Sequence, residues 1–185
     1  MQKTIKLLLI LGALLSSLHA QNSVSIEEIT VTSATKSEQS INDVTSNVNV
    51  ITSEEIEEKH YKTVGEALNS VSGLNFISNG GLGKSSSLKV RGFDSKRVLV
   101  LIDGIRYNDV TSAGGAPFEH LMINDIEQIE VVKGAQSGIW GSDATAGVIN
   151  IIMKNAEKGL HGFINSEYGS FDTTKYGGGA SYKTD

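Results

Sequence analysis

The chain has 185 residues, with 16 basic and 21 acidic side chains and a formal net charge of −5. An acidic balance argues against a nucleic-acid-binding protein. The sequence contains no cysteine, which excludes a disulfide framework and any metal site built on thiolates, so its stability must come from an ordinary packed core.

The first twenty residues have the plan of a cleaved secretory signal. Lys3 and Lys6 precede an apolar run over residues 7–15, and the small residue Ala20 ends the segment. The run is too short to cross a bilayer core, which needs about 20 apolar residues. We therefore expect a signal peptide over residues 1–20 and a mature chain that leaves the cytoplasm; a retained membrane anchor is the alternative.

A polar stretch rich in Ser, Thr and Glu follows over residues 21–42. Its composition predicts a flexible segment. Inside it, residues 27–32 are β-prone and alternate in polarity, so they can add as a strand to the edge of a partner's sheet. An N-terminal extension without such a role is the alternative.

Two pairs of residues mark helix starts. Thr52 with Glu55, and Thr63 with Glu66, have the spacing of a capping box. They predict a strand over 48–52 that leads into a helix to about residue 59, and a second helix over 64–71 that Gly73 ends.

The centre of the chain alternates between short apolar segments and loops rich in Gly and Ser. The apolar run 98–102 predicts a strand covered on both faces, and Asp103-Gly104 predicts the turn that closes it. The pattern indicates an α/β or α+β globule with a small mixed sheet. Further strands are expected at 74–77, 88–90, 128–132 and 148–152, and a helical turn at 121–126.

From residue 162 the pattern changes. Residues 162–169 alternate weakly, a polar turn follows at 170–174, and residues 176–182 form a second strand with Tyr and Phe near the strand ends. This is typical of a membrane β-barrel hairpin. An ordinary edge hairpin would show the same period.

The sequence shows no catalytic apparatus. Gly83-Lys84-Ser85 has the end of a phosphate-binding loop, but Ser78 stands where the first glycine is required and a strand pattern follows instead of a helix. His60, His120 and His161 are isolated and lack metal-ligand spacing. We expect no enzyme activity, and no metal or cofactor bound by this segment.

A series of ordered motifs carries a family resemblance. The block 97–106, RVLVLIDGIR, resembles the central strand and turn of TonB-dependent receptor plugs. Blocks 88–93, 126–134, 141–144 and 147–152 are similar to the neighbouring plug motifs, in the same order, and 28–32 to the coupling box after the signal peptide. The chain is identified as a member of this family, most similar to the cobalamin-receptor branch; siderophore and haem receptors share most of the motifs.

The resemblance implies an α+β fold and a division of the chain. A flexible segment, 21–42, would hold the coupling (TonB) box at 27–32, and 43–155 would form a small mixed-sheet plug with short helices. Residues 156–185 would be the first, incomplete hairpin of a transmembrane antiparallel β-barrel. The implied function is the gate in TonB-coupled active uptake of a scarce metal chelate, which is a cobalamin, a siderophore-iron complex or haem.

The resemblance also implies residue roles. TonB, with its inner-membrane energising complex, would bind the box by strand addition. The chain's own barrel would meet Arg91 and Lys133, where Lys133 can offer only a point charge and Ala135 replaces the usual proline. The box residues are Glu27, Glu28, Ile29, Thr30, Val31 and Thr32. The expected ligand-contacting loop residues are Asn79, Gly80, Gly81, Lys84, Ser85, Asp94, Ser95, Asn108, Asp109, Ser112 and Gly114.

A complete barrel of this class requires more chain than follows the plug. It needs about 22 strands, and only residues 156–185 remain. We therefore expect a part of an outer-membrane receptor with its box in the periplasm. The alternatives are a freestanding periplasmic binding module, if the protein ends at Asp185, or a truncated receptor without function.

Overall fold

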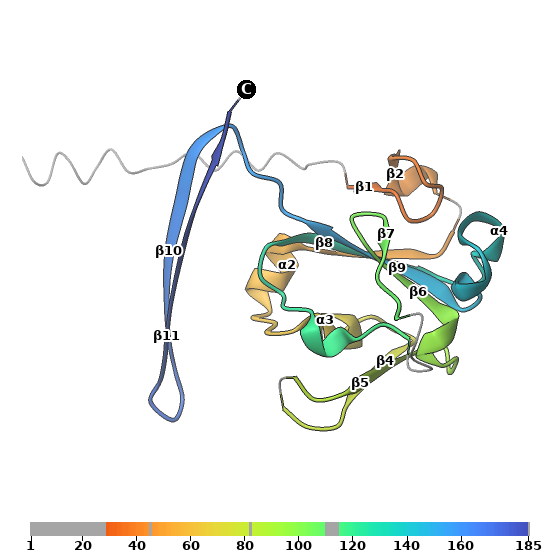
Figure 1. The fold of residues 1–185 in the computed structure, drawn as a ribbon, viewed down its shortest axis with the longest axis horizontal. Coiled ribbons are helices and arrows are strands. Elements are labelled where there is room, and N and C mark those ends of the chain that lie inside the picture. Colours follow the sequence, from red (N-terminus) through yellow and green to blue (C-terminus); the bar gives the residue numbers. More distant parts are fainter. Residues whose placement is uncertain (1–28, 45, 82, 110–114, 185) are drawn as a thin grey trace, which may run out of the picture.

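The computed structural model describes residues 29–44, 46–81, 83–109 and 115–184. Its main body is a five-stranded sheet in the order β3-β8-β9-β6-β7 (Figure 1). β9 and β6 run parallel and the other neighbours antiparallel, which confirms the predicted mixed sheet. The strands are β3 (Val48–Thr52), β6 (Val98–Ile102), β7 (Ile105–Arg106), β8 (Ile126–Lys133) and β9 (Gly147–Met153).

Different parts of the chain cover the two faces of this sheet. The larger core lies on the face covered by α2 (Ser53–Glu58), α3 (Val64–Asn69), the hairpin of β4 (Leu74–Ser78) and β5 (Ser86–Val90), and the 3₁₀ turn η3 (Phe118–His120). On the opposite face, alternate residues of β6, β8 and β9 pack against Ala34, Ala144 and Trp140. The first four residues of β6 are therefore at most 2% exposed, as the apolar run predicts.

Both predicted helix starts are confirmed. Thr52 Oγ1 accepts from Glu55 N at 3.4 Å, and Thr63 Oγ1 accepts from Glu66 N at 3.2 Å. Neither glutamate side chain returns to its cap residue, because Glu55 pairs with Lys59 and Glu66 accepts from the backbone N–H of Lys62. The second helix ends at residue 69, two residues earlier than expected.

The helical turn expected at 121–126 is wrong. The turn η3 comes earlier, directly after Pro117, and Ile126 already belongs to β8. Asp125 has φ 62°, a left-handed conformation that no right-handed helix can include. The short elements that were not predicted include α4 (Ser137–Trp140) and the 3₁₀ turn η4 (Ser142–Ala144). No helix in the described ranges is long and apolar enough to cross a membrane.

A long hairpin lies beside the five-stranded sheet and the segments that cover it (Figure 1). β10 (Gly159–Gly169) and β11 (Thr173–Lys183) pair antiparallel, as the change of pattern after residue 162 predicts. One face holds Leu160, Ile164, Tyr168 and, from β11, Tyr176 and Tyr182, all at least 70% exposed. The opposite face is mainly polar or glycine, apart from Phe163.

Candidate functional site

Residues 29–34, which we call the docked segment, lie on the sheet face opposite the large core. Within it β1 (Thr30–Val31) pairs with β2 (Gln39–Ser40), and the turn η1 (Ile41–Asp43) follows. Val31, Ser33 and Ala34 are 0–2% exposed. Within the segment expected to be flexible, burial and the hydrogen bonds described below hold residues 31–34 on the sheet, whereas residues 35–39 are exposed. Residues 1–28, including the expected signal peptide, Glu27 and Glu28, lie outside the described residues.

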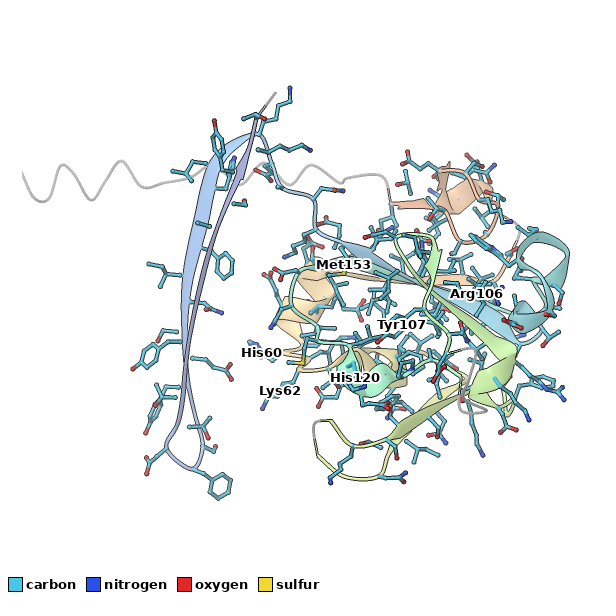
Figure 2. The ribbon with its side chains drawn as sticks, in the orientation of Figure 1. His60, Lys62, Arg106, Tyr107, His120 and Met153 are labelled. Carbon is cyan, nitrogen blue, oxygen red and sulfur yellow. The ribbon has the colours of Figure 1, made fainter. Side chains whose placement is uncertain are left out.

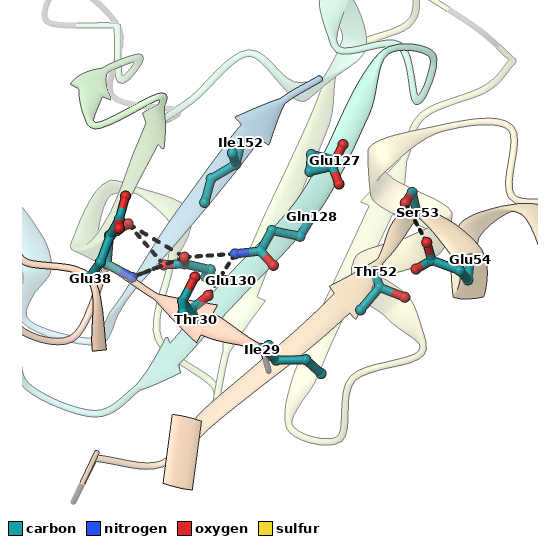
Figure 3. A pocket seen from close by; sticks show the side chains of 11 residues that line it. Ile29, Thr30, Glu38, Thr52, Ser53, Glu54, Glu127, Gln128, Glu130 and Ile152 are labelled. Carbon is teal, nitrogen blue, oxygen red and sulfur yellow. Dashed lines mark hydrogen bonds between the residues drawn. The ribbon is translucent and has the colours of Figure 1, made fainter. Parts of the chain in front are cut away.

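One buried carboxylate holds the backbone of this segment. Glu130 of β8 is 0% exposed. Its Oε1 accepts from Thr32 N at 3.0 Å, and its Oε2 accepts from Ser33 N at 2.7 Å. Gln128 Nε2 donates to Glu130 Oε1 at 3.1 Å and to Thr30 O at 2.9 Å (Figure 3). Three of these hydrogen bonds, those from Thr32 N, Ser33 N and Gln128 Nε2, bring an N–H donor to a carboxylate oxygen.

The side chains of Trp140 and Asn150 also form hydrogen bonds with the docked segment. Trp140 Nε1 donates to Ser33 O at 2.7 Å, and Lys36 Nζ lies 4.7 Å from the centre of the Trp140 ring. Asn150 of β9 donates from Nδ2 to Thr32 Oγ1 at 3.1 Å. The motifs and periodicities of the sequence do not single out Glu130, Asn150 or Trp140. The sequence does contain one sign of their role. Glu130 and Asn150 are polar residues inside the largely buried strands β8 and β9.

An open groove of about 810 Å³ borders the docked segment (Figure 3). Ile29 and Ile152 supply apolar lining, while Glu38, Glu54 and Glu127 make its rim acidic. The hydrogen bond from Thr52 lowers the pKa of Glu54 below its ordinary value, so this charge is kept at neutral pH. Part of the expected coupling box therefore lies next to a negatively charged surface.

The loop between β4 and β5 contains five of the expected ligand-contacting residues. Asn79 N donates to Ser85 O at 3.1 Å, and Asn79 Nδ2 donates to Ser85 Oγ at 3.0 Å, which closes the loop. Gly80, Gly81 and Lys84 lie at its exposed tip. This loop and the docked segment lie at opposite ends of the body formed by the five-stranded sheet and its covering layers (Figure 1).

The other expected ligand-contacting residues are not gathered at that tip. Asp94 is exposed, but Ser95 is only 7% exposed and lies under Gly115, where an added Cβ would be 2.7 Å from the Ser95 carbonyl carbon. Asn108 Oδ1 accepts from Val100 N at 2.7 Å and its Nδ2 donates to Val98 O at 2.8 Å, which gives it a structural role along β6. Asp109 donates from its backbone N to Gly115 O. Ser112 and Gly114 lie outside the described residues.

The two expected barrel-facing cations flank one turn. Arg91 N donates to Gly73 O at 2.7 Å, and Lys133 Nζ donates to Ser72 O at 3.1 Å. The Arg91 side chain makes no hydrogen bond or ion pair within the described ranges, and the residue has φ 51°. An exposed arginine held in an unfavourable backbone conformation is a candidate contact residue.

β7 connects the sheet to the loop before η3. Arg106 forms an ion pair with Asp143 of η4, while Tyr107 points toward η3 and its hydroxyl donates to Pro117 O at 3.4 Å (Figure 2). Burial and the nearby charge of Glu119 raise the pKa of Tyr107. Burial works to raise the pKa of Glu119, but hydrogen bonds from its own backbone and from Ser86 outweigh it, so that pKa lies below its ordinary value.

Among the described residues, no group of three or more His, Asp or Glu side chains is placed to hold a metal ion.

The fold and the docked N-terminal strand define a plug-type domain. A family model described as the TonB-dependent Receptor Plug Domain matches residues 40–148. This match spans more than half of the chain, so the chain belongs to the TonB-dependent receptor plug family.

Curated relatives point to one branch of the family. The chain is 42% identical over 142 residues to the vitamin B12 transporter BtuB of Vibrio vulnificus, a match that covers 77% of this chain and 23% of the relative. It is 37% identical over 158 residues to the BtuB of Vibrio cholerae serotype O1, covering 85% and 26%. The resemblance to the cobalamin-receptor branch is confirmed, and the chain spans about a quarter of the length of these relatives.

Solved structures show the same fold at lower identity. The alcaligin outer membrane receptor FauA of Bordetella pertussis matches with a TM-score of 0.63 and 21% identity, over 80% of this chain and 25% of FauA. The ferripyoverdine receptor of the Pseudomonas aeruginosa outer membrane matches with a TM-score of 0.66 and 19% identity, over 80% and 19%. The predicted plug fold is confirmed.

Proposed function

We propose that this chain is the gate and coupling part of an outer-membrane receptor that takes up a scarce metal chelate by TonB-coupled active transport. The observation that carries this proposal is the placement of β1 at one end of a plug whose β4–β5 loop lies at the other end (Figure 1). Such a plug can accept force at one end and respond to a ligand at the other. The family membership supports the same assignment.

A cobalamin is the first candidate for the transported ligand. The chain is 42% identical to a vitamin B12 transporter over most of its own length. The Gly-rich tip of the β4–β5 loop permits a close backbone approach to a large ligand. The chelate is cargo in this proposal, and the plug needs no bound cofactor.

The hairpin β10–β11 is proposed as the start of the barrel that would surround the plug. Its strands of 11 residues have the length of a transmembrane β-strand, about 9 to 11 residues. The apolar face carries Leu160 and Tyr182 at one end, Tyr168 and Tyr176 at the other, and Ile164 between them. Aromatic residues at both ends of an apolar strand face are typical of such barrels.

Arg91 and Lys133 are proposed to meet carboxylates on the inner wall of this barrel. Arg91 is exposed and offers a bidentate donor. Lys133 already donates to the Ser72 carbonyl and retains two further donors.

Uptake and binding measured separately in the full-length receptor test the assignment. Ile29→Pro removes a backbone N–H from the segment that would add to TonB, whereas Ile29→Ala keeps it. We expect Ile29→Pro to abolish cobalamin uptake by cells while cobalamin binding to outer membranes stays at the wild-type level. An equal loss of binding and uptake would contradict the coupling role. Binding of ferric siderophore or haem in place of cobalamin would contradict the ligand assignment alone.

A further inference from the structure

Both hydrogen-bonding edges of β1 are occupied in the docked segment. Along one edge β1 pairs with β2. Along the other edge, side chains of β8 form the hydrogen bonds. Gln128 Nε2 donates to Thr30 O at 2.9 Å, and Glu130 Oε1 accepts from Thr32 N at 3.0 Å. A strand that adds to a sheet needs a free edge. The docked segment therefore offers none for residues 30–32.

Gln128 and Glu130 reproduce the contacts of a neighbouring strand. They lie two residues apart on β8, so their side chains project from the same face of the sheet. Together they present one donor and one acceptor to the backbone of residues 30–32. A partner strand would offer the same kinds of group to the same atoms.

Glu130 carries most of this interaction. It is 0% exposed, and two successive backbone N–H groups of the docked segment, those of Thr32 and Ser33, donate to it. The hydroxyl of Thr32 lies 3.4 Å from both carboxylate oxygens. Hydrogen bonds to an ionised group are the strong ones. If the segment leaves, Glu130 loses these hydrogen bonds and keeps Gln128 as its remaining described partner.

We propose that Glu130 is the positioning residue of the coupling step, which holds residues 29–34 on the plug and, with Gln128, closes the edge of β1 to a partner strand. The consequence for TonB rests on the proposed function, because it assumes binding by strand addition. TonB then gains residues 30–32 only after the Glu130 hydrogen bonds break. Glu130 thus sets how often the coupling segment is available.

Ser33 affects the same equilibrium between the docked and the released segment, but its hydroxyl favours release. The Ser33 hydroxyl is buried and has no hydrogen-bond partner within the described part of the chain. An unsatisfied buried hydroxyl disfavours the docked state. Ser33→Ala removes it without disturbing the backbone N–H that donates to Glu130, so this variant should dock more tightly.

Thiol accessibility in the full-length receptor, without TonB, tests the proposal directly. These 185 residues contain no cysteine, and any cysteine elsewhere in the full-length receptor is replaced by serine before labelling. Val31 is 0% exposed, so Val31→Cys reacts with a maleimide only when the segment leaves the sheet. We combine it with Glu130→Gln, which keeps the size of the side chain, and with Glu127→Gln as the matched control. Glu127 is exposed on the same strand and lines the same groove. Val100→Cys, 1% exposed in the large core, reports global unfolding.

Glu130→Gln should raise the labelling rate at position 31 by about tenfold or more, the change expected when a charge-assisted hydrogen bond is lost. Ser33→Ala should lower that rate by about fivefold, and Glu127→Gln and the rate at position 100 should not change. An unchanged rate at position 31 in Glu130→Gln, or an equal rise at position 100, overturns the proposal. TonB binding is then measured separately on the Glu130→Gln receptor with Val31 intact, and we expect it to be stronger than in the wild type. A faster labelling rate at position 31 without stronger TonB binding supports the docking role of Glu130 and overturns the assignment of TonB to this segment.

Discussion

Thr32 and Asn150 are 118 residues apart in the chain, and a hydrogen bond of 3.1 Å joins the Thr32 Oγ1 to the Asn150 Nδ2. The same Asn150 accepts from Gly104 N through its Oδ1 at 3.2 Å. One buried amide therefore connects the docked segment to the β6–β7 turn. That turn leads through β7 toward the loop before η3, which holds part of the expected ligand-contacting set.

Asn150→Asp should destabilise the plug. Asn150 is 3% exposed and lies directly across from Glu130 in the β8–β9 pairing. The change removes the donor to Thr32 and places a second carboxylate beside a buried one, which we expect to cost about 3 kcal/mol or more of unfolding free energy. Urea denaturation measures the effect, and Asn75→Asp is its control because Asn75 is exposed on β4 across from Lys89. Equal denaturation midpoints for the two variants would contradict the role of Asn150.

Trp140→Phe should loosen the docked segment and leave the sheet intact. The indole Nε1 donates to Ser33 O at 2.7 Å, and phenylalanine keeps a ring but offers no donor. The loss of one such hydrogen bond is worth about 1 kcal/mol, so the Ser33 amide should exchange with solvent roughly fivefold faster. Native-state hydrogen exchange measures this, with the buried Ile149 amide of β9 as the internal control. Equal changes at both amides would indicate general destabilisation instead.

The apolar pattern and the turn residues of the local sequence were sufficient to predict the central strand of the sheet and the turn after it. The apolar run 98–102 forms a strand buried on both faces, and Asp103 and Gly104 take φ 49° and 77° in the turn that follows. The left-handed conformation of a turn is a property of two residues and their immediate neighbours. Such features can be predicted without knowledge of the remaining chain.

The docked segment could not be predicted in this way. Residues 29–34 are polar enough for a flexible tail, and they are ordered by Glu130, Trp140 and Asn150, which lie about 100 residues further along the chain. The polar residues inside two buried strands were the visible sign that something must satisfy them. Only the tertiary pairing of β8 with β9 shows that Glu130 and Asn150 lie side by side to do so.

Gly147→Ala should be strongly destabilising, because the backbone at this point leaves no room for a side chain. Gly147 begins β9, and an added Cβ would lie 2.5 Å from the carbonyl oxygen of Val132. Both atoms belong to the paired backbone of β8 and β9, so relief requires a shift of one strand against the other. We expect a loss of about 3 kcal/mol.

Gly138→Ala is the matched control for this change. A Cβ at Gly138 meets no atom within 4 Å, and the residue lies in the short helix α4, where alanine is the better helix former. Its thermal unfolding midpoint should equal or slightly exceed that of the wild type. A similar midpoint for Gly147→Ala would show that the two strands can separate at this point without cost.

Ile164→Lys should block assembly of the receptor in the outer membrane if the apolar face of β10–β11 faces lipid. Ile164 lies midway along that face and is 93% exposed. A lysine at the middle of a membrane strand costs about 2–4 kcal/mol. Asn165→Lys adds the same charge to the opposite face, where we expect normal assembly because that face would line the barrel interior. Heat-modifiable mobility of the full-length receptor on gels measures assembly, and equal yields of the two variants would show that this face does not meet the bilayer.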